Sequence, residues 1–219
     1  MKNLFFIFLA LSIFPIYLSA QNGEQDPRFL FDKFEKGKIV FNKGGSSEAF
    51  LNYNVLLGKF VFLSDDKTIM ELGNPSLVSY IDINGRIFEH IKNSDFYEKV
   101  KDGSEKLLLY VKWSSSLMSQ GQKSSYGVNP GTSSGSSDVD YDGYSFKSKV
   151  DKNIVLNPRN TFFIKLDNKF QKFNSADSLA KLFKNNEAEI KKYLKEQKYD
   201  FKKLDDIKKA IEYCSQYME

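Results

Sequence analysis

Between residues 37 and 113, glycine-containing turn signals cut the chain into short apolar runs, and this spacing constrains the fold more than any other feature. Asn84-Gly85 separates two such runs, and Asp102-Gly103 precedes the strongly apolar run at residues 107–111. Asn-Gly and Asp-Gly favour two-residue hairpin turns, because both central residues need a positive φ. Strands joined so tightly pair antiparallel, since parallel pairing needs a long crossover. This part of the chain is therefore predicted to form an antiparallel meander.

After Ser175 the spacing of apolar residues becomes helical. In the last segment they recur at steps of three and four, which places one stripe on a helix: Leu204, Ile207, Ile211, Cys214 and Met218. We therefore expect an α+β protein that is mainly β, with an antiparallel meander curled into a sandwich or open barrel and a C-terminal helical unit. The expected division is a signal peptide at residues 1–20, an antiparallel β domain at 21–174 and a helical unit packed on it at 175–219.

Local signals also predict where the helices begin. Asn186 followed by Glu189 resembles a capping box, and Asp200 can cap the last helix. Two acidic–basic pairs have the four-residue spacing that stabilises an exposed helix: Glu187 with Lys191, and Asp205 with Lys209. Because acidic and basic residues are interleaved along these helices, we interpret their polar side as a solvated face rather than a membrane surface.

Residues 114–137 interrupt the strand pattern with a sequence dominated by Ser and Gly. Such a stretch cannot bury enough apolar surface to offset the entropy lost on ordering, so a flexible loop is predicted. Loops of this length are also frequently functional. Trp113 and Tyr126 keep a folded binding loop open as the alternative.

The first residues have the pattern of a secretory signal peptide. Lys2 precedes an apolar run at residues 4–14, Pro15 ends that run, and Leu18-Ser19-Ala20 resembles a cleavage site before Gln21. The run is shorter than the roughly 20 residues that span a bilayer, and no later segment is apolar for long enough. We expect a mature chain without a transmembrane segment, secreted across the inner membrane and then periplasmic, outer-membrane-associated or extracellular. A buried N-terminal helix is the alternative interpretation of the run.

Net charge and residue counts exclude several classes of function. With 32 Lys and Arg against 28 Asp and Glu, the net charge is only +4, so no nucleic-acid partner is expected. A single His and a single Cys leave little material for a zinc site, a Ser-His-Asp triad or a Cys-His pair. We interpret His90 as structural rather than as a base, and Cys214 as a core residue rather than a reactive thiol.

Two short motifs each have a functional and a structural interpretation. Asp177-Ser178-Leu179 resembles an acceptor for periplasmic O-glycosylation, but Asp or Ser at this place would also cap a helix. Asp138, Asp140 and Asp142 alternate with other residues, as at the start of a calcium loop. Lys149 stands where such a loop has its bidentate Glu. We predict weak calcium binding at most, with a polar turn as the alternative, and no other cofactor.

Several segments together resemble a group of uncharacterised secreted, β-rich proteins from Gram-negative bacteria. The segments are residues 34–37, 51–55 and 60–63, the leucine-rich run at 105–111, and 189–193 and 199–203 in the tail. In that group a β-rich body precedes a variable polar loop and a short helical tail. The resemblance implies the same fold and export, and it implies no activity or ligand.

These observations predict an exported, non-enzymatic binding or assembly protein of the bacterial cell envelope, with an envelope protein or polymer as its partner. The alternative is a hydrolase of envelope polymers, which would use a pair of Asp or Glu carboxylates in a cleft. An open apolar or aromatic surface would favour the binding protein. A deep cleft holding two carboxylates of raised pKa would favour the hydrolase.

Overall fold

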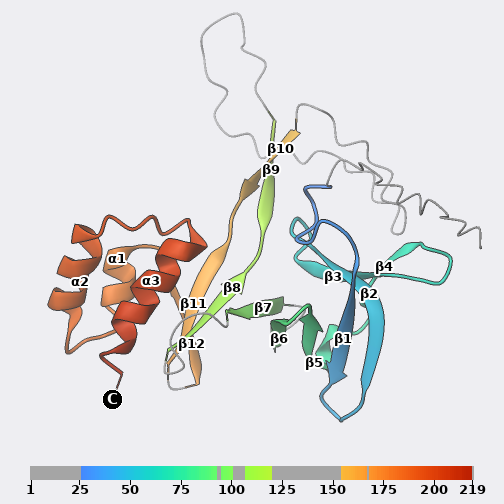
Figure 1. The fold of residues 1–219 in the computed structure, drawn as a ribbon, viewed down its shortest axis with the longest axis horizontal. Helices are drawn as coiled ribbons and strands as arrows, with labels where there is room; N and C mark the ends of the chain where they lie inside the picture. Colours follow the sequence, from blue (N-terminus) through green and yellow to red (C-terminus); the bar gives the residue numbers. More distant parts are fainter. Residues whose placement is uncertain (1–25, 93–94, 101–106, 120–153, 167, 219) are drawn as a thin grey trace, which may run out of the picture.

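The computed structural model describes residues 26–92, 95–100, 107–119, 154–166 and 168–218 (Figure 1). Ten strands form one sheet in the order β12-β11-β8-β7-β6-β5-β1-β2-β3-β4, and β9 pairs with β10 in a separate two-stranded sheet. The strands are β1 Glu35–Phe41, β2 Ser46–Asn54, β3 Lys59–Leu63, β4 Ile69–Glu71, β5 Val78–Ile83, β6 Arg86–Lys92, β7 Asp95–Val100, β8 Leu108–Lys112, β9 Ser115–Ser119, β10 Ile154–Pro158, β11 Thr161–Leu166 and β12 Lys169–Phe173. The helices are the short 3-10 helix η1 at Pro75–Leu77, α1 Ala176–Ala180, α2 Glu187–Glu196 and α3 Leu204–Ser215.

The predicted fold class is confirmed: a long antiparallel meander precedes a few helices. The sheet curls strongly. The evidence is that the ring of Phe60 on β3 lies 5.1 Å from both Phe88 on β6 and Phe96 on β7. Three further strands separate β3 from β6 in the sheet. The curl brings these rings together without closing the described strands into a barrel.

The hairpin predicted at Asn84-Gly85 is present. Asn84 and Gly85 take φ values of 52° and 81° between β5 and β6, and the carboxylate of Asp82 accepts a 2.8 Å hydrogen bond from the Gly85 amide. Strands β7 and β8 pair antiparallel as expected, with Glu98 opposite Val111. The turn between them, with Asp102-Gly103, lies outside the described residues. Local turn chemistry therefore accounts for the β5–β6 hairpin.

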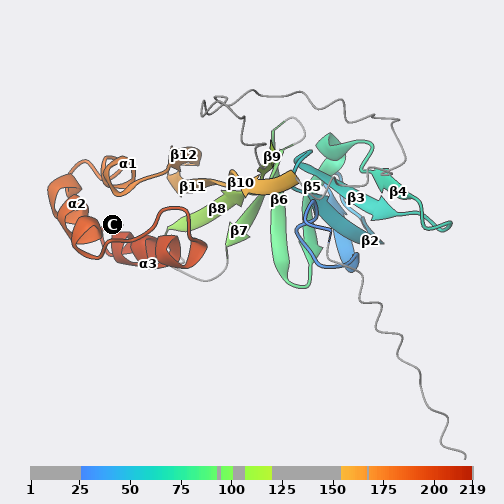
Figure 2. The same cartoon turned by 90° about the horizontal axis from the view of Figure 1, so that it is seen from above.

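One face of the sheet carries both hydrophobic cores. Phe88, Glu98, Val111 and Phe162 are cross-strand partners in one row over β6, β7, β8 and β11. The row starts in the core enclosed by the curl, whose centre includes Leu51, Tyr53, Phe60, Ile81, Phe88 and Phe96. It ends in the core beneath the helices, whose centre includes Val111, Phe162, Ile164, Leu179, Ile211 and Cys214. Trp113 packs against both cores, and Figure 2 shows the helices at one end of the sheet and β2–β4 at the other.

The opposite face has an aromatic cluster of its own. Tyr97 stacks on Phe163 with ring centroids 4.7 Å apart, and the ring of Phe170 lies edge-on to Tyr97 and Tyr110. Tyr110 is almost fully buried, and its hydroxyl donates a 3.0 Å hydrogen bond to Glu89. These four rings hold β7, β8, β11 and β12 together from the side away from the helices.

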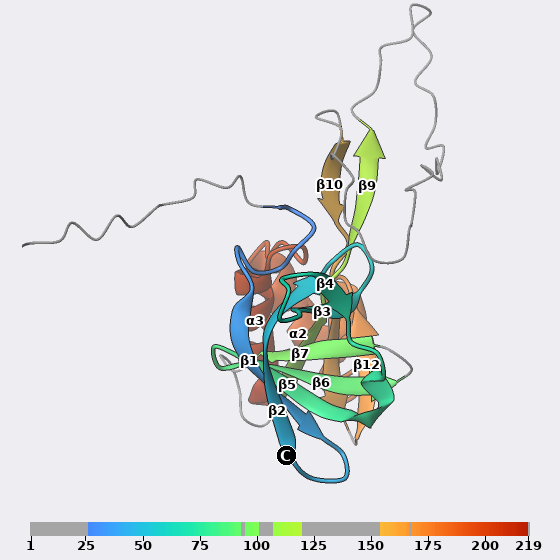
Figure 3. The same ribbon diagram turned by 90° about the vertical axis from the view of Figure 1, so that its right-hand side faces the viewer.

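The start of the predicted flexible loop is a strand, so that boundary of the prediction is wrong. Ser115–Ser119 forms β9 and pairs with β10, and both strands project from the main sheet (Figure 3). Backbone hydrogen bonds hold this segment: the Arg159 amide donates to the Ser114 carbonyl, and the Ser115 amide donates to the Val55 carbonyl. The rest of the predicted loop, residues 120–137, lies outside the described residues.

The helix caps differ in part from the predictions. Asn186 is the residue before α2, as predicted, but its side chain makes no capping hydrogen bond. Lys203, not Asp200, precedes α3. The Asp200 carboxylate instead accepts a 2.9 Å hydrogen bond from the Lys202 amide, while Asp206 in the first turn of α3 accepts one from the Asp200 amide. Asp200 therefore shapes the loop before the helix rather than the helix itself.

The apolar stripe of α3 faces the core as predicted. Ile207, Ile211 and Cys214 are buried, and Leu204 and Met218 pack against the same core. Among the described residues, no helix is long and apolar enough to cross a bilayer.

Candidate functional site

The three aspartates of the predicted calcium loop cannot be placed. Asp138, Asp140 and Asp142 lie outside the described residues, so the predicted weak calcium site stays a prediction. Elsewhere in the described chain, no three His, Cys, Asp or Glu side chains gather closely enough to hold a metal ion.

The single histidine and the single cysteine both lie among residues that pack the fold. His90 lies on β6, and its ring centroid is 5.2 Å from that of Phe96. Cys214 is a free thiol with no exposed surface, and burial raises its pKa to about 12. The thiol therefore stays protonated at neutral pH, which fits the core interpretation and not a reactive nucleophile.

The Asp177-Ser178 motif lies in the first turn of α1. Ser175 is the N-cap residue, and Ser178 completes a capping box with it through reciprocal hydrogen bonds. The Ser178 hydroxyl also contacts the Asn174 amide at 3.0 Å. Capping is therefore confirmed as a role of this motif, although the capping residue is Ser175 rather than Asp177 or Ser178.

A concave site lies next to this cap. A shallow, open depression with a volume of about 380 Å³ lies between the first turn of α1 and the loop joining α2 to α3, and we call it the helical groove. Its apolar lining comes from Ala176, Leu194, Tyr199 and Phe201. The volume lies within the range of about 300–1,000 Å³ that is typical of ligand sites.

The main core holds the floor of the groove in place. Leu194 is 1% exposed on α2, and the ring of Phe201 packs edge-on against Phe173 of β12 at 6.2 Å. Tyr199 forms one wall; burial and its hydrogen bond with Tyr193 raise its pKa. Tyr193 in turn stacks flat on Tyr213 of α3, with ring centroids 3.5 Å apart. The floor and the wall therefore rest on both the sheet and α3.

Local backbone geometry positions the rim of the groove. Lys198 ends α2 in the left-handed region, with φ of 55°, and its amide donates to the Lys195 carbonyl. The two aspartate hydrogen bonds that shape the following loop place Lys202 close to the same opening. Lys198 and Lys202 are exposed, and neither forms an ion pair within the described part of the chain.

The groove also has an acidic residue, Asp177, whose charge is neutralised by lysines of α2. Asp177 pairs with Lys191 at 2.9 Å and with Lys195 at 3.2 Å, both on α2. Hydrogen bonds and charge from these lysines hold the pKa of Asp177 below its usual value. Asp177 is therefore an ionised, paired carboxylate at neutral pH, and the groove keeps an excess of positive charge at its rim.

A second cavity is smaller. It has a volume of about 130 Å³ and lies between β3, β4 and Phe96 of β7, beside an ion pair in which the Lys59 ammonium is 2.8 Å from the Glu71 carboxylate. The volume suits a few water molecules rather than a ligand.

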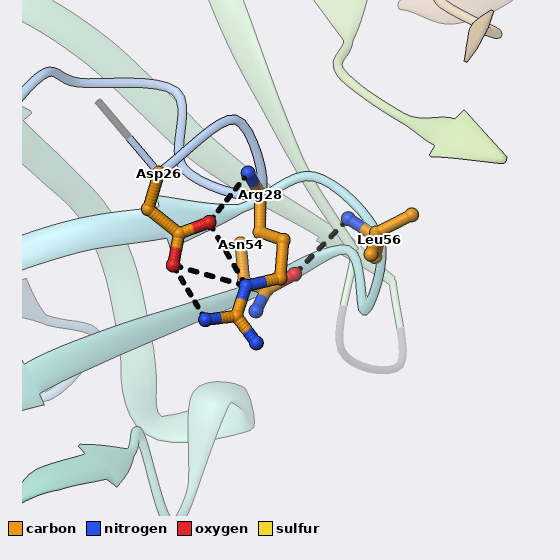
Figure 4. A network of polar contacts seen from close by, with 4 residues as sticks. All are labelled: Asp26, Arg28, Asn54 and Leu56. Atoms are coloured by element: carbon orange, nitrogen blue, oxygen red, sulfur yellow. Dashed lines mark hydrogen bonds and ion pairs between the residues drawn. The ribbon is translucent and has the colours of Figure 1, made fainter. Parts of the chain in front are cut away.

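Two polar clusters in the sheet region are structural. Glu98 is 8% exposed and receives two 2.7 Å hydrogen bonds from Arg86 and one from the Trp113 indole. Near the start of the described chain, Arg28 folds back onto the carboxylate of Asp26, and the Asn54 side chain accepts a hydrogen bond from the Leu56 amide (Figure 4). The first cluster ties β6, β7 and Trp113 together, and the hydrogen bonds of the second fix the local backbone at residues 26–28 and 54–56.

Comparison with known proteins gives no relative: no family model, no curated protein and no solved structure matches this chain. The resemblance drawn from the sequence therefore stays a prediction.

Sequence reasoning missed the helical groove. It noted Lys191 as a partner for Glu187, but the structure pairs Lys191 with Asp177 on another helix. It also assigned Asp200 to the N-cap of the last helix, whereas the residue before α3 is Lys203. The one local signal was the cluster of aromatic and basic residues at 198–202. It was interpreted as part of a solvated helix face rather than as a site.

Proposed function

We propose that this protein is an exported, non-enzymatic binding or assembly protein of the bacterial cell envelope, and that it binds its partner through the helical groove. The observation that carries the proposal is the groove itself: an open depression of about 380 Å³ with apolar and aromatic side chains in its lining and two exposed lysines without an ion pair in the described chain at its rim. Aromatic side chains beside charged groups are typical of binding sites. The export part rests on the signal-peptide pattern of residues 1–20.

The electrostatics of the groove favour binding over hydrolysis. A glycosidase-like reaction needs one carboxylic acid of raised pKa to protonate the leaving group. The groove contains two aspartates, Asp177 and Asp200. The pKa of Asp177 is shifted downward by Lys191 and Lys195, which is the wrong direction for a general acid. The Asp200 carboxylate accepts a hydrogen bond from the Lys202 amide, so it is already used in shaping the loop.

The test is a binding experiment with a groove variant. The mature chain, beginning at Gln21, is immobilised and exposed to fractionated envelope extract, alongside Tyr199→Ala and, as a control, Tyr80→Ala on β5. We expect one envelope component to be retained by the wild type and the control and lost with Tyr199→Ala. Equal retention by all three proteins would contradict the groove as the binding site.

The alternative is tested in parallel. Incubation of the same mature chain with purified envelope polysaccharide would release reducing ends if the protein were a hydrolase. We expect no release above that of a heat-denatured sample. Release that disappears in Asp177→Asn would overturn the proposal and favour the enzyme.

A further inference from the structure

We infer that the helical groove takes an acidic peptide segment of a partner protein, with one apolar side chain seated on the groove floor. This inference rests on the proposed function, because it names the chemistry of the partner for the same site. It is carried by the match between the floor and an apolar anchor, and by the charge left unpaired at the rim.

The floor requires an apolar group from the partner. Ala176, Leu194 and Phe201 contribute no hydrogen-bonding side chain to the cavity. A sugar ring on these residues would have to turn its hydroxyl groups to the polar side chains of the rim or to water to keep its hydrogen bonds. An aliphatic or aromatic side chain of a peptide loses no such bonds and gains burial instead. The apolar part of the lining therefore fits an apolar side chain of a peptide, and a polysaccharide is the alternative that the experiment tests.

The rim requires negative charge from the partner. Asp177 is neutralised by two lysines, whereas the exposed Asp200 carboxylate keeps its charge while it accepts a hydrogen bond from the Lys202 amide. The lining holds three lysines against these two aspartates, so its net charge is positive. Lys198 and Lys202 stand exposed at the opening with no ion pair in the described chain. Carboxylates flanking the apolar anchor would reach these two ammonium groups. Charge complementarity thus selects an acidic segment, and it discriminates against basic ones.

The groove is held ready for such a ligand. Its floor is packed against Phe173 and the main core, and its rim loop is fixed by the hydrogen bonds of Asp200 and Asp206. A site that is already in place avoids the entropy of ordering on binding. Binding is therefore expected to leave the positions of α2 and α3 unchanged.

The experiment is a titration of the ¹⁵N-labelled mature protein with short blocked peptides, followed by amide chemical shifts. The probe is Gly-Asp-Phe-Asp-Gly, with Gly-Asn-Phe-Asn-Gly as the uncharged control and Gly-Asp-Ala-Asp-Gly as the control without an anchor. We expect the probe to shift the amides of the groove loop and each control to bind about three- to tenfold more weakly. About 0.5 M salt should reduce the affinity of the probe to that of the uncharged control.

Matched variants separate the two rim lysines from general charge. Lys198→Asn combined with Lys202→Gln removes both charges, and Asn tolerates the left-handed backbone at position 198. Lys181→Gln combined with Lys184→Gln removes the same charge from exposed positions outside the groove lining. Only the first pair should weaken binding of the probe. Equal affinity for acidic and uncharged peptides, or equal effects of the two variants, would overturn the inference.

The result also distinguishes this inference from the proposed function. If the peptide does not bind but the envelope component is still lost with Tyr199→Ala, the groove binds a partner of another chemistry and only this inference fails. An acidic polysaccharide that shifts the groove amides while the peptide does not would have the same meaning. If neither the peptide nor the envelope component depends on the groove, both proposals fail.

Discussion

Glu98 is the residue at which burial and charge conflict most strongly in the described structure. Its carboxylate lies between the two cores, 8% exposed, and is satisfied by Arg86 and the Trp113 indole. The Arg86 guanidinium also lies over the rings of Phe31 and Phe88. Such an ion pair adds little net stability compared with an apolar pair, but removing one partner leaves the other charge buried.

We expect Glu98→Ala to lower the free energy of unfolding by about 1–3 kcal/mol, because Arg86 and the Trp113 indole would lose their partner but Arg86 remains partly hydrated. Urea denaturation followed by circular dichroism measures the change. Glu48→Ala is the matched control, since Glu48 pairs with Lys36 but both side chains are at least 60% exposed. A loss for Glu98→Ala no larger than that of the control would contradict the interpretation of the pair as buried.

Gly37 is required because its surroundings leave no room for a Cβ atom, and not because its backbone conformation needs glycine. A Cβ atom at this position would lie 2.8 Å from Leu51 Cδ1 and 2.9 Å from Ile83 Cγ1, in the middle of the row β5-β1-β2. Gly37→Ala should therefore destabilise the protein by about 1–3 kcal/mol through overpacking. A Cβ at Gly73 meets nothing within 4 Å, so Gly73→Ala is the control. Thermal melts of the two variants should differ, and equal midpoints would contradict the steric argument.

At the scale of elements, α3 is held by one side only. Ile211 is 1% exposed in the core beneath the helices, whereas the Lys209 side chain is 62% exposed and lies 4.0 Å from Asp206. Ile211→Asp would place an unpaired charge in the core and should cost about 3–5 kcal/mol or unfold the tail. Lys209→Asp should be nearly silent. Chemical denaturation of both variants checks the assignment, and similar losses would mean that the buried face is wrongly identified.

The strand β9 divides the Ser- and Gly-rich segment into two parts with different expected roles. Replacing residues 120–137 with a short Gly-Ser linker should leave the free energy of unfolding within about 1 kcal/mol, because loop-closure entropy changes slowly with length. Replacing the residues of β9 as well should cost more, since the pairing with β10 and the Ser115–Val55 hydrogen bond would be lost. Melting temperatures of the two replacements give the comparison. A large loss from the first replacement alone would show that residues 120–137 stabilise the fold.

At the scale of the whole molecule, one sheet face carries two cores that meet at Trp113. The indole packs on both and also donates to Glu98. We expect the wild type to unfold in a single calorimetric transition, because the two cores share this contact and the strands between them. Trp113→Ala should broaden or split that transition, as the helical end and the curled end unfold less cooperatively. A single sharp transition in the variant would show that the sheet alone couples the two ends.

Several features followed from sequence because their causes are local. The turn at Asn84-Gly85 needs only two residues that tolerate positive φ, and the stripe of α3 needs only its own spacing. A cap at the start of α1 was also predicted, although the N-cap residue is Ser175 rather than Asp177 or Ser178. The mainly β class and the helical tail were therefore predictable. The predicted loop began too early because β9 is ordered by backbone hydrogen bonds to β10, which its Ser-rich composition does not reveal.

The sequence by itself determined the mainly β class, the helical tail and the buried side of the last helix, since each depends on residues a few positions apart. Only the tertiary structure decided which charges meet. Asp177 pairs with Lys191 and Lys195 of α2, and Glu98 pairs with Arg86 of the neighbouring strand. The helical groove exists because α1, the end of α2 and the following loop converge on one core. Packing that joins distant segments creates such a site, and no local pattern of residue types encodes it.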